Sequence, residues 1–289
     1  MKIDPDQFRA PKGNGVDLAK WPTEVKPAYR SKDHYLELLE SHREQLAAQQ
    51  ELLYADGRYS LLVVLQGMDA GGKDGVIKHV VSGLNPQGCQ VHSFKHPGPE
   101  ELQHDFLWRT TQQLPARGHI GIFNRSYYEE VLIVRVHPKI LESEGVPHEG
   151  GQDIWQGRYH SIQAHEEHLH RNGTRVIKFF LHISKDEQRK RLLARLDDPT
   201  KRWKFNLSDL EERSYWKDYM KAYGDCIAAT SSKQAPWYVV PADDKRNARL
   251  IISRLIVDAL KALDLDYPKE SPELRRRLGE IRKRLEKKR

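Results

Sequence analysis

The segment from Gly67 to Lys73 has the composition of a phosphate-binding loop. It reads Gly-Met-Asp-Ala-Gly-Gly-Lys, follows an apolar run that ends at Leu65, and precedes a helix-like stretch. Glycines let consecutive backbone N–H groups turn towards an anion, the helix amino terminus adds partial positive charge, and a lysine neutralises phosphate oxygens. The spacing G-x-x-x-x-G-K in this context therefore predicts phosphate binding. The residues expected to contact phosphate are Ala70, Gly71, Gly72, Lys73 and Asp74.

An acidic side chain inside this loop, Asp69, is unusual for a site that binds anions. It would repel phosphate unless a cation lay between the two. The residue after Lys73 is Asp74, where P-loop proteins carry a Ser or Thr that binds magnesium. We therefore expect Asp69 to bind Mg²⁺ in place of that hydroxyl. The structural alternative is an Asx-turn, in which the carboxylate accepts hydrogen bonds from loop N–H groups.

A second polar cluster starts at Asn124, directly after the apolar run that ends at Phe123. Arg125 can bind a phosphate through two N–H groups and stabilise charge on a transferred phosphoryl group. Glu129 offers a second carboxylate to the metal, and we expect Asn124 and Tyr128 to contact a nucleotide. The alternative is an ordinary ion pair between neighbouring surface side chains.

A cationic segment broken by Pro199 carries Arg202 and Lys204 between two expected helices. Such a segment predicts a lid, at about residues 196–215, that brings cations over bound phosphates and excludes water. Trp203, between the two cations, indicates a lid tip that packs against the domain. A solvated loop between helices is the alternative.

Three further cations, Lys95, Arg109 and Arg117, are expected near the ends of the second and third strands. Arg109 falls on the expected helix after Pro99, where nucleotide kinases often hold their acceptor. We expect all three to contact a nucleotide, with a solvated surface as the alternative.

Alternating apolar strands and amphipathic helices connect these motifs. Strands are expected at 59–65, 91–94, 119–124, 176–182 and 237–240, and helices at 31–55, 74–84, 100–114, 127–132, 153–170, after Ser184, and at 248–263. Ser31 and Ser184 are expected to cap the helices that follow them. This alternation predicts an α/β fold with a parallel sheet and helices on both faces. Ligands in such sheets bind beyond the carboxyl ends of the strands.

Composition limits the remaining possibilities. The chain has 289 residues, two cysteines and a formal net charge of +7. No apolar stretch is long enough to span a membrane, the amino terminus lacks the apolar core of a signal peptide, and the few cysteines suit a reducing cytoplasm. The net charge indicates an anionic partner, for which polyphosphate, nucleotides and nucleic acid are all admissible.

Three segments are expected along the chain: a loose amino-terminal arm (1–30), a P-loop domain that includes the lid (31–265), and a basic amphipathic helix (266–289). The last of these repeats arginine and lysine around Leu274, Leu278, Ile281 and Leu285. Such a helix can guide a polyanion, bind nucleic acid, dock on another subunit or remain solvated.

These residues resemble the family-2 polyphosphate kinases, which are P-loop enzymes related in architecture to thymidylate kinase. The resemblance runs from about Leu52 to Leu263 and rests on the phosphate loop, on Phe123-Asn124-Arg125-Ser126 and on the lid sequence around Trp203. It extends to Ser184-Lys185-Asp186-Glu187-Gln188 and to Ala235-Pro236-Trp237-Tyr238-Val239. It implies a three-layer P-loop kinase fold with a helical lid.

The resemblance also implies an activity: reversible, Mg²⁺-dependent phosphoryl transfer between inorganic polyphosphate and AMP or ADP, giving ADP or ATP. Asp69, Lys73 and Arg125 occupy the catalytic positions of the family, and Arg202 and Lys204 its lid positions. Many members have an acidic residue where this chain has Asn124 and an asparagine where it has Glu129. This version is similar to the subgroup that accepts both AMP and ADP, and it makes Asp69 with Glu129 the expected metal pair.

The remaining polymer would need a groove of cations, and Lys78, one turn into the phosphate-loop helix, is its expected start. The resemblance suggests a homo-oligomer, a dimer or tetramer. Two other functions stay open: a nucleoside monophosphate kinase that uses ATP as donor, and a P-loop-derived protein that binds nucleic acid through its basic tail. Asp69 and Lys73 in one loop favour catalysis, so neither nucleic acid nor a membrane is the expected partner.

Overall fold

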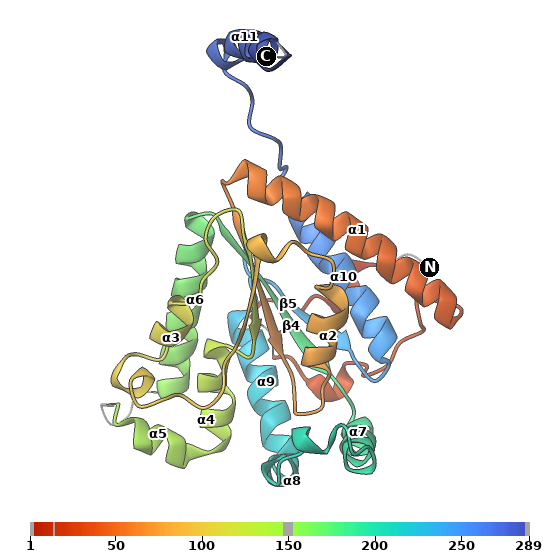
Figure 1. Cartoon of the computed structure of the whole chain (residues 1–289). Helices are drawn as coiled ribbons and strands as arrows, with labels where there is room; N and C mark the ends of the chain where they lie inside the picture. Colours follow the sequence, from red (N-terminus) through yellow and green to blue (C-terminus); the bar gives the residue numbers. More distant parts are fainter. Residues whose placement is uncertain (1–2, 14, 147–152, 287–289) are drawn as a thin grey trace.

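A parallel sheet forms the centre of the protein (Figure 1). The computed structural model describes residues 3–13, 15–146 and 153–286, and these contain five strands in the order β2-β3-β1-β4-β5. The strands are β1 Ser60–Gln66, β2 Cys89–Ser93, β3 Ile120–Asn124, β4 Thr174–His182 and β5 Trp237–Pro241. The phosphate loop follows β1, the central strand, and the second polar cluster follows its neighbour β3. Both motifs therefore lie at the same edge of the sheet.

Helices cover both faces of this sheet. The α-helices are α1 Lys32–Asp56, α2 Lys73–Val80, α3 Trp108–Thr111, α4 Ile133–Val136, α5 Pro138–Glu144, α6 Ile154–Arg171, α7 Lys185–Asp197, α8 Ser208–Ser214, α9 Trp216–Thr230, α10 Lys245–Lys261 and α11 Pro272–Glu286. Short 3-10 helices are η1 Pro5–Phe8, η2 Leu18–Lys20, η3 Pro86–Gly88, η4 Glu101–Gln103, η5 Tyr127–Val131 and η6 Arg202–Lys204.

Alternate side chains of β1 enter two separate cores. Leu61, Val63 and Leu65 pack in one cluster with residues of α1, α2 and α10, whereas Leu62 and Val64 pack in the other with residues of α6 and α9. Because both faces of the strand are buried, it is apolar without interruption. The predicted α/β fold with helices on both faces is confirmed.

Two helix starts follow the predicted capping chemistry. The Ser31 hydroxyl accepts a hydrogen bond from the His34 N–H at 3.1 Å, and α1 begins one residue after Ser31. The Ser184 hydroxyl accepts one from the Glu187 N–H at 3.0 Å, at the start of α7. These side chains satisfy backbone donors that have no partner within the helix.

The predicted continuous helix at 100–114 is wrong. The segment forms η4 and α3, separated by a turn in which the Asp105 carboxylate accepts a hydrogen bond from the Leu107 N–H at 2.9 Å. Aspartate competes in this way with helical hydrogen bonds, so it ends one helical turn and starts another.

The amino-terminal arm is not loose in its described part. Ala10 donates its N–H to the carbonyl of Trp237 at 2.9 Å, and Arg9 forms an antiparallel bridge with Tyr238 on the outer edge of β5. Further along, the Ala28 N–H donates to the side-chain oxygen of Asn247 at 2.9 Å. The arm thus covers a sheet edge and a helix start of the domain.

The carboxyl-terminal helix α11 stands clear of the domain at the end of an extended segment (Figure 1). Residues 287–289 of the predicted basic segment lie outside the described residues. None of the helices in the described ranges is both long and apolar enough to cross a membrane.

Candidate active site

The phosphate loop turns tightly between β1 and α2. The Gly71 N–H donates to the Met68 carbonyl at 2.9 Å, and a Cβ atom on Gly71 would lie 2.7 Å from that same oxygen. Gly72 has a φ of 110°, which side chains rarely adopt. The two glycines are therefore required by this backbone path, which leads the chain into the amino terminus of α2.

Lys73 lies beneath this loop with its side chain buried. Its ammonium group donates to the carbonyls of Gly67 and Met68, the latter at 3.3 Å. Burial lowers the pKa of the Lys73 amine to about 8, and the nearby Arg125 guanidinium acts in the same direction against the carboxylates around it. Within the described part of the chain, no carboxylate forms an ion pair with Lys73. Its charge is therefore balanced only by backbone carbonyls of the loop among the described residues.

Arg125 reaches the loop because β3 pairs directly with β1, in a register that sets Leu65 opposite Asn124. The Arg125 N–H continues the pairing by donating to the Leu65 carbonyl at 3.0 Å. Its φ of 64° is rare for a residue with a side chain. Such a conformation is found where surrounding structure enforces it, commonly at functional sites. Here it accompanies a guanidinium that faces the phosphate loop.

The Arg125 guanidinium pairs with the Asp69 carboxylate at 2.7 Å. The Glu129 carboxylate, followed by that of Asp69, holds the pKa of Arg125 above its usual range. When the amide of Gln66 is oriented with its nitrogen towards Glu129, it donates to that carboxylate at 2.9 Å. Asp69 and Glu129 therefore both act electrostatically on the Arg125 guanidinium, and Asp69 contacts it directly. Asp69 makes an ion pair across the site, and no loop N–H donates to its side chain among the described residues.

This pair of carboxylates is compatible with Mg²⁺. In the parts of the chain that are described, no three His, Cys, Asp or Glu side chains gather into a complete metal site. Mg²⁺ commonly binds through one or two carboxylates and completes its shell with substrate phosphates and water. The donor set offered by Asp69 and Glu129 fits that pattern.

Two residues that the sequence predicts to contact ligands, Asn124 and Lys204, both lie close to Asp74 at the start of α2. The Asn124 amide donates to the Asp74 carboxylate at 3.0 Å, and the Lys204 ammonium lies 3.7 Å from it. Lys204 belongs to the predicted lid, whose tip therefore reaches the phosphate loop. Arg202, by contrast, donates to the Leu196 carbonyl within the lid itself.

The tip of the lid does not pack as Trp203 indicated. The Trp203 side chain is 77% exposed, and its ring N–H donates to the Thr200 carbonyl at 3.0 Å. The lid is fixed at its base instead, where Arg195 pairs with Asp209 at 3.4 Å. The indole ring of Trp203 therefore stays in solvent, although the neighbouring Lys204 reaches Asp74.

A residue that the sequence reasoning missed supports the loop from the far side of the site. Arg191 of α7 donates to the carbonyls of Ala70 and Gly71 at 3.1 and 3.0 Å. It also donates to the carbonyls of Ala242 and Asp243, after β5. Gln188, one turn earlier, donates to the Asp69 carbonyl at 3.1 Å. The sequence signal for this support is the short segment from Ser184 to Gln188 at the start of α7, which resembles the family.

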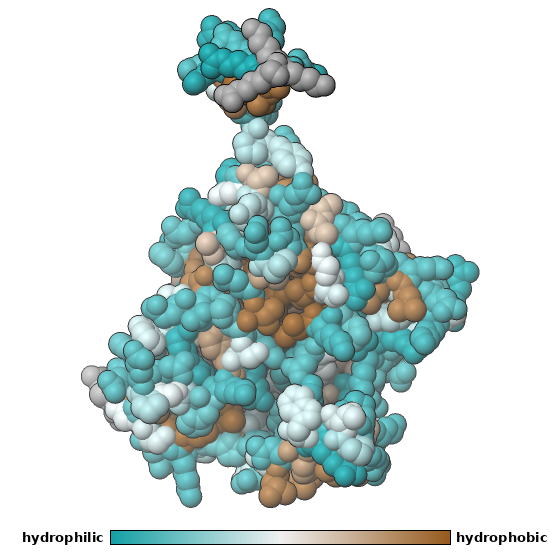
Figure 2. Space-filling view, viewed as in Figure 1, coloured by the Kyte–Doolittle hydropathy of each residue, from teal (hydrophilic) through white to brown (hydrophobic). Residues whose placement is uncertain are grey.

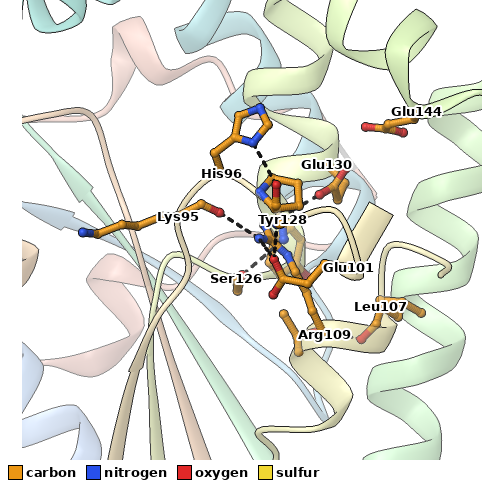
Figure 3. A network of polar contacts seen from close by, with 12 residues as sticks. Lys95, His96, Glu101, Leu107, Arg109, Ser126, Tyr128, Glu130 and Glu144 are labelled. Atoms are coloured by element: carbon orange, nitrogen blue, oxygen red, sulfur yellow. Dashed lines mark hydrogen bonds and ion pairs between the residues drawn. The ribbon is translucent and has the colours of Figure 1, made fainter. Parts of the chain in front are cut away.

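Lys95 and Arg109, both expected to contact a nucleotide, have different surroundings. Arg109 is buried, donates to the Lys95 carbonyl at 2.7 Å, and faces Glu101 and Glu130 at 3.7 and 3.8 Å (Figure 3). Burial raises the pKa of the Glu130 carboxyl to about 7, together with repulsion from Glu144. The Lys95 ammonium points away from this network (Figure 3). Arg109 also lines an open hollow of about 560 Å³ with Pro99, Trp108 and neighbouring residues.

Two expectations fail on position. Arg117 precedes β3 and so lies at the amino edge of the sheet, opposite the phosphate loop. Tyr128 is fully buried, where its hydroxyl donates to Glu166 at 2.8 Å and accepts from Lys178 at 2.9 Å. Neither side chain faces the edge that carries the site. Lys78 is exposed on α2, one turn beyond the loop.

Comparison with known proteins gives one consistent result. A family model described as Polyphosphate kinase 2 (PPK2) matches residues 29–268. An ADP-polyphosphate phosphotransferase of Rhodopseudomonas palustris is 61% identical over 287 residues, which is 99% of both chains. An AMP/ADP-polyphosphate phosphotransferase of Meiothermus ruber is 46% identical over 263 residues, 91% of this chain and 95% of the relative.

A solved structure agrees with these relatives. The crystal structure of Polyphosphate Kinase 2 from Arthrobacter aurescens TC1 superposes with a TM-score of 0.85 at 43% identity. The superposition covers 96% of each chain. Sequence and architecture therefore match the same group of proteins over nearly the whole chain.

Proposed function

Because this chain belongs to the polyphosphate kinase 2 family, we propose that it transfers phosphoryl groups reversibly between inorganic polyphosphate and AMP or ADP. ADP and ATP are the nucleotide products in the direction of polyphosphate use. The relatives named above act on these substrates by name. We propose that the protein is located in the cytoplasm, where its substrates are.

One observation carries the proposal at the level of chemistry. Among the described residues, Lys73 holds a buried positive charge that has no carboxylate ion-pair partner, and an Asp69–Arg125 ion pair lies across the same loop. Phosphoryl transfer depends on positioning and charge neutralisation more than on covalent assistance. Arg125, Lys73 and the glycine loop would supply positioning and charge neutralisation. The Asp69 carboxylate would then be free to bind a metal ion.

The roles of the residues follow from their positions. The loop N–H groups and Lys73 would bind the terminal phosphate of the polymer. Arg125 would release Asp69 and bind the transferring group, whose charge it would stabilise through two N–H groups. The acceptor phosphate would attack in line from the opposite side. No side-chain nucleophile is needed for this reaction.

Mg²⁺ is the proposed cofactor, with Asp69 and Glu129 as its protein ligands. When bound, it would neutralise phosphate charge and orient the reacting oxygens. Asp69 would then exchange one cationic partner, Arg125, for another. That exchange explains how a carboxylate can belong to a loop that binds anions.

The acceptor nucleotide is proposed to lie at the side of the site where β2 and β3 end. Lys95 and Asn124 would contact it, and the hollow beside Arg109 is within the usual size range for small-ligand pockets. Arg109 would act by fixing the segment that it links to Glu101. The lid, residues 196–215, would bring Lys204 and Arg202 over the phosphates, and Lys78 would contact polymer that extends beyond the loop.

The decisive assay uses purified protein, long-chain polyphosphate and Mg²⁺, with AMP or ADP as acceptor, and measures ADP and ATP. We expect phosphorylation of the acceptor that requires polyphosphate and is abolished by Asp69→Ala, with the circular dichroism spectrum unchanged. Lys233→Ala, at an exposed position outside the site, is the matched control and should keep parental activity. Phosphorylation of AMP by ATP without any reaction of polyphosphate would instead establish a nucleoside monophosphate kinase.

A further inference from the structure

Three charged side chains are buried between the loop after β2 and helix α6. Most charged side chains of the described chain are exposed or half-buried, and the face shown in Figure 2 is largely hydrophilic. Arg109, Glu130 and Arg158 are exceptions, with 7%, 6% and 5% of their surfaces exposed. Even a well-paired buried ion cluster adds little net stability. Glu130 and Arg158 have no part in the transfer mechanism proposed above, so neither stability nor direct catalysis explains their burial.

Arg109 holds the loop that follows β2. One of its terminal nitrogens donates to the Lys95 carbonyl at 2.7 Å and lies 3.7 Å from the Glu101 carboxylate. The same carboxylate oxygen of Glu101 accepts from the Gly98 N–H at 2.6 Å. The segment from Lys95 to Glu101 is thus folded around one guanidinium group. Because Gly98, Glu101 and Arg109 all line the hollow proposed for the acceptor, the position of Arg109 determines the shape of that hollow.

Glu130 holds Arg109 from the opposite side. The Glu130 carboxylate lies 3.8 Å from the other terminal nitrogen of Arg109, and Figure 3 shows how Arg109 links Glu130 to Lys95 and Glu101. A planar guanidinium group whose two terminal nitrogens face different carboxylates has little freedom to rotate. The orientation of Arg109 therefore depends on Glu130.

Arg158 of α6 fixes Glu130 in turn. Its guanidinium group donates to the Glu130 backbone carbonyl at 2.7 Å and lies 3.4 Å from the Glu130 carboxylate. It also pairs with the Glu144 carboxylate of α5. The Phe106 and Trp155 rings lie 5.4 and 5.8 Å from it. Held by these neighbours, Arg158 constrains both the main chain and the side chain of Glu130.

We propose that Glu130 and Arg158 are positioning residues for the acceptor nucleotide. Arg158 would hold Glu130, and Glu130 would hold Arg109 in the orientation that shapes the acceptor hollow. This role rests on the proposed function, because it requires AMP or ADP to bind in that hollow. Polyphosphate is proposed to bind at the phosphate loop, which neither Glu130 nor Arg158 contacts among the described residues. Loss of either residue should therefore weaken binding of the acceptor more than binding of polyphosphate.

The first test uses Glu130→Gln in the full chain, which keeps the size of the side chain and removes its charge. The KM for AMP and for ADP should rise by about fivefold to tenfold, while the KM for polyphosphate stays within about twofold of the parent and kcat changes less than the acceptor KM. Glu142→Gln, at an exposed position of α5, is the matched control and should leave all three constants unchanged.

Replacements of Arg158 supply an independent variant should Glu130→Gln fold poorly. Arg158→Met should raise the acceptor KM as Glu130→Gln does. Arg158→Lys, which retains the positive charge but not the fork of donors, should recover part of the loss. Circular dichroism and thermal unfolding show whether each variant is folded. A merely structural role would lower the thermal midpoint and the amount of active enzyme, and it would leave the acceptor KM unchanged.

A double-mutant cycle tests whether Glu130 acts through Arg109. Arg109→Gln alone should raise the acceptor KM, and Glu130→Gln added to it should cause no further rise, because the group that Glu130 positions is already absent. Effects on the acceptor KM that multiply in the double variant would overturn the proposed order of contacts.

Calorimetric titration of ADP with Mg²⁺, in the absence of polyphosphate, separates this role from the proposed function. A parent protein that transfers no phosphate from polyphosphate but binds ADP, with an affinity that Glu130→Gln lowers, would reject the proposed function and retain the positioning role. A parent that transfers phosphate, while Glu130→Gln keeps the parental acceptor KM and ADP affinity, would overturn the positioning role alone. A parent that neither transfers phosphate nor binds ADP would overturn both.

Discussion

Two lysines buried beside the same sheet have opposite surroundings. Lys73 lies under the phosphate loop and donates only to backbone carbonyls. Lys178, in β4, pairs with the Glu166 carboxylate and also donates to the Tyr128 hydroxyl and the Thr230 carbonyl. Burial lowers the pKa of both amines. The difference is that Lys178 forms an ion pair within the protein, whereas Lys73 has no ion-pair partner among the described residues.

The comparison separates a buried charge that is compensated within the protein from the buried charge that we propose binds phosphate. A buried ion pair contributes little net stability, but removal of one partner leaves the other charge uncompensated. A buried charge without a counterion destabilises the protein, and proteins retain such groups mainly at active sites. Changes at the two lysines should therefore affect different quantities.

The largest effect is expected for Lys73→Met. In the proposed mechanism, loss of the ammonium removes a phosphate ligand that acts in the transition state, so the rate of transfer from polyphosphate should fall by at least about 10³-fold. The midpoint of urea unfolding should not decrease. Steady-state rates and unfolding curves of the same preparation measure both; transfer near the parental rate would exclude Lys73 from the site.

Lys178→Met should produce the reverse pattern. Glu166 would remain buried without its cation, so the free energy of unfolding should fall by about 3–5 kcal/mol. Activity per folded molecule should stay close to that of the parent, because Lys178 does not reach the phosphate loop. Adding Glu166→Leu should recover part of the lost stability, and its failure to do so would show that the pair is not the origin of the effect.

The pH dependence of stability should distinguish the two lysines next. The pKa of Lys73 falls from 10.5 in the unfolded chain to about 8 in the folded protein. Below pH 8 the amine is charged in both states, so its burial lowers the free energy of unfolding by the full amount. Between pH 8 and 10.5 the folded state holds fewer protons than the unfolded state, and stability from this group rises with pH. Lys73→Met should thus be more stable than the parent at pH 7, by up to about 3 kcal/mol. This advantage should shrink by pH 10 in urea titrations, and an advantage independent of pH would contradict the assignment.

A smaller effect is expected for Arg191→Lys, which keeps the charge but not the fork of donors that holds Ala70 and Gly71. Small displacements of a catalytic loop reduce rates strongly, so kcat should fall about tenfold with a smaller change in KM for polyphosphate. Arg189→Lys on the same helix is the control, since Arg189 is exposed and only lies near Asp186. Equal losses in both variants would place the effect in helix α7 as a whole.

The smallest effect is expected for Glu129→Asn, which removes one of the two carboxylates beside Arg125. The concentration of Mg²⁺ needed for half-maximal rate should rise several-fold, or the ratio of AMP to ADP turnover should change. Mg²⁺ titrations with each acceptor measure this. Identical titrations for parent and variant would mean that Glu129 acts on neither metal nor acceptor.

The sequence predicted the strands, the loop and the helix start that carry the candidate site, because local pattern controls them. A glycine loop between a strand and a helix located Lys73 and Asp69, and the apolar run before Arg125 indicated the neighbouring strand. Arg191 was missed because it contacts a loop about 120 residues away, which no local spacing reveals. Arg117 was misplaced because a residue before a parallel strand lies at the opposite edge from one after it. Tyr128 was misread because the turn after Ser126 directs aromatic side chains into the core as readily as towards a ligand.

The arm that pairs with β5 has a consequence for handling the protein. Edge strands expose unpaired backbone groups that recruit other strands, and residues 9 and 10 occupy those groups here. A fragment that begins at α1 would lack residues 9 and 10, so the edge of β5 would have no pairing segment. Such a fragment would keep its catalytic loop and lose its protection against aggregation.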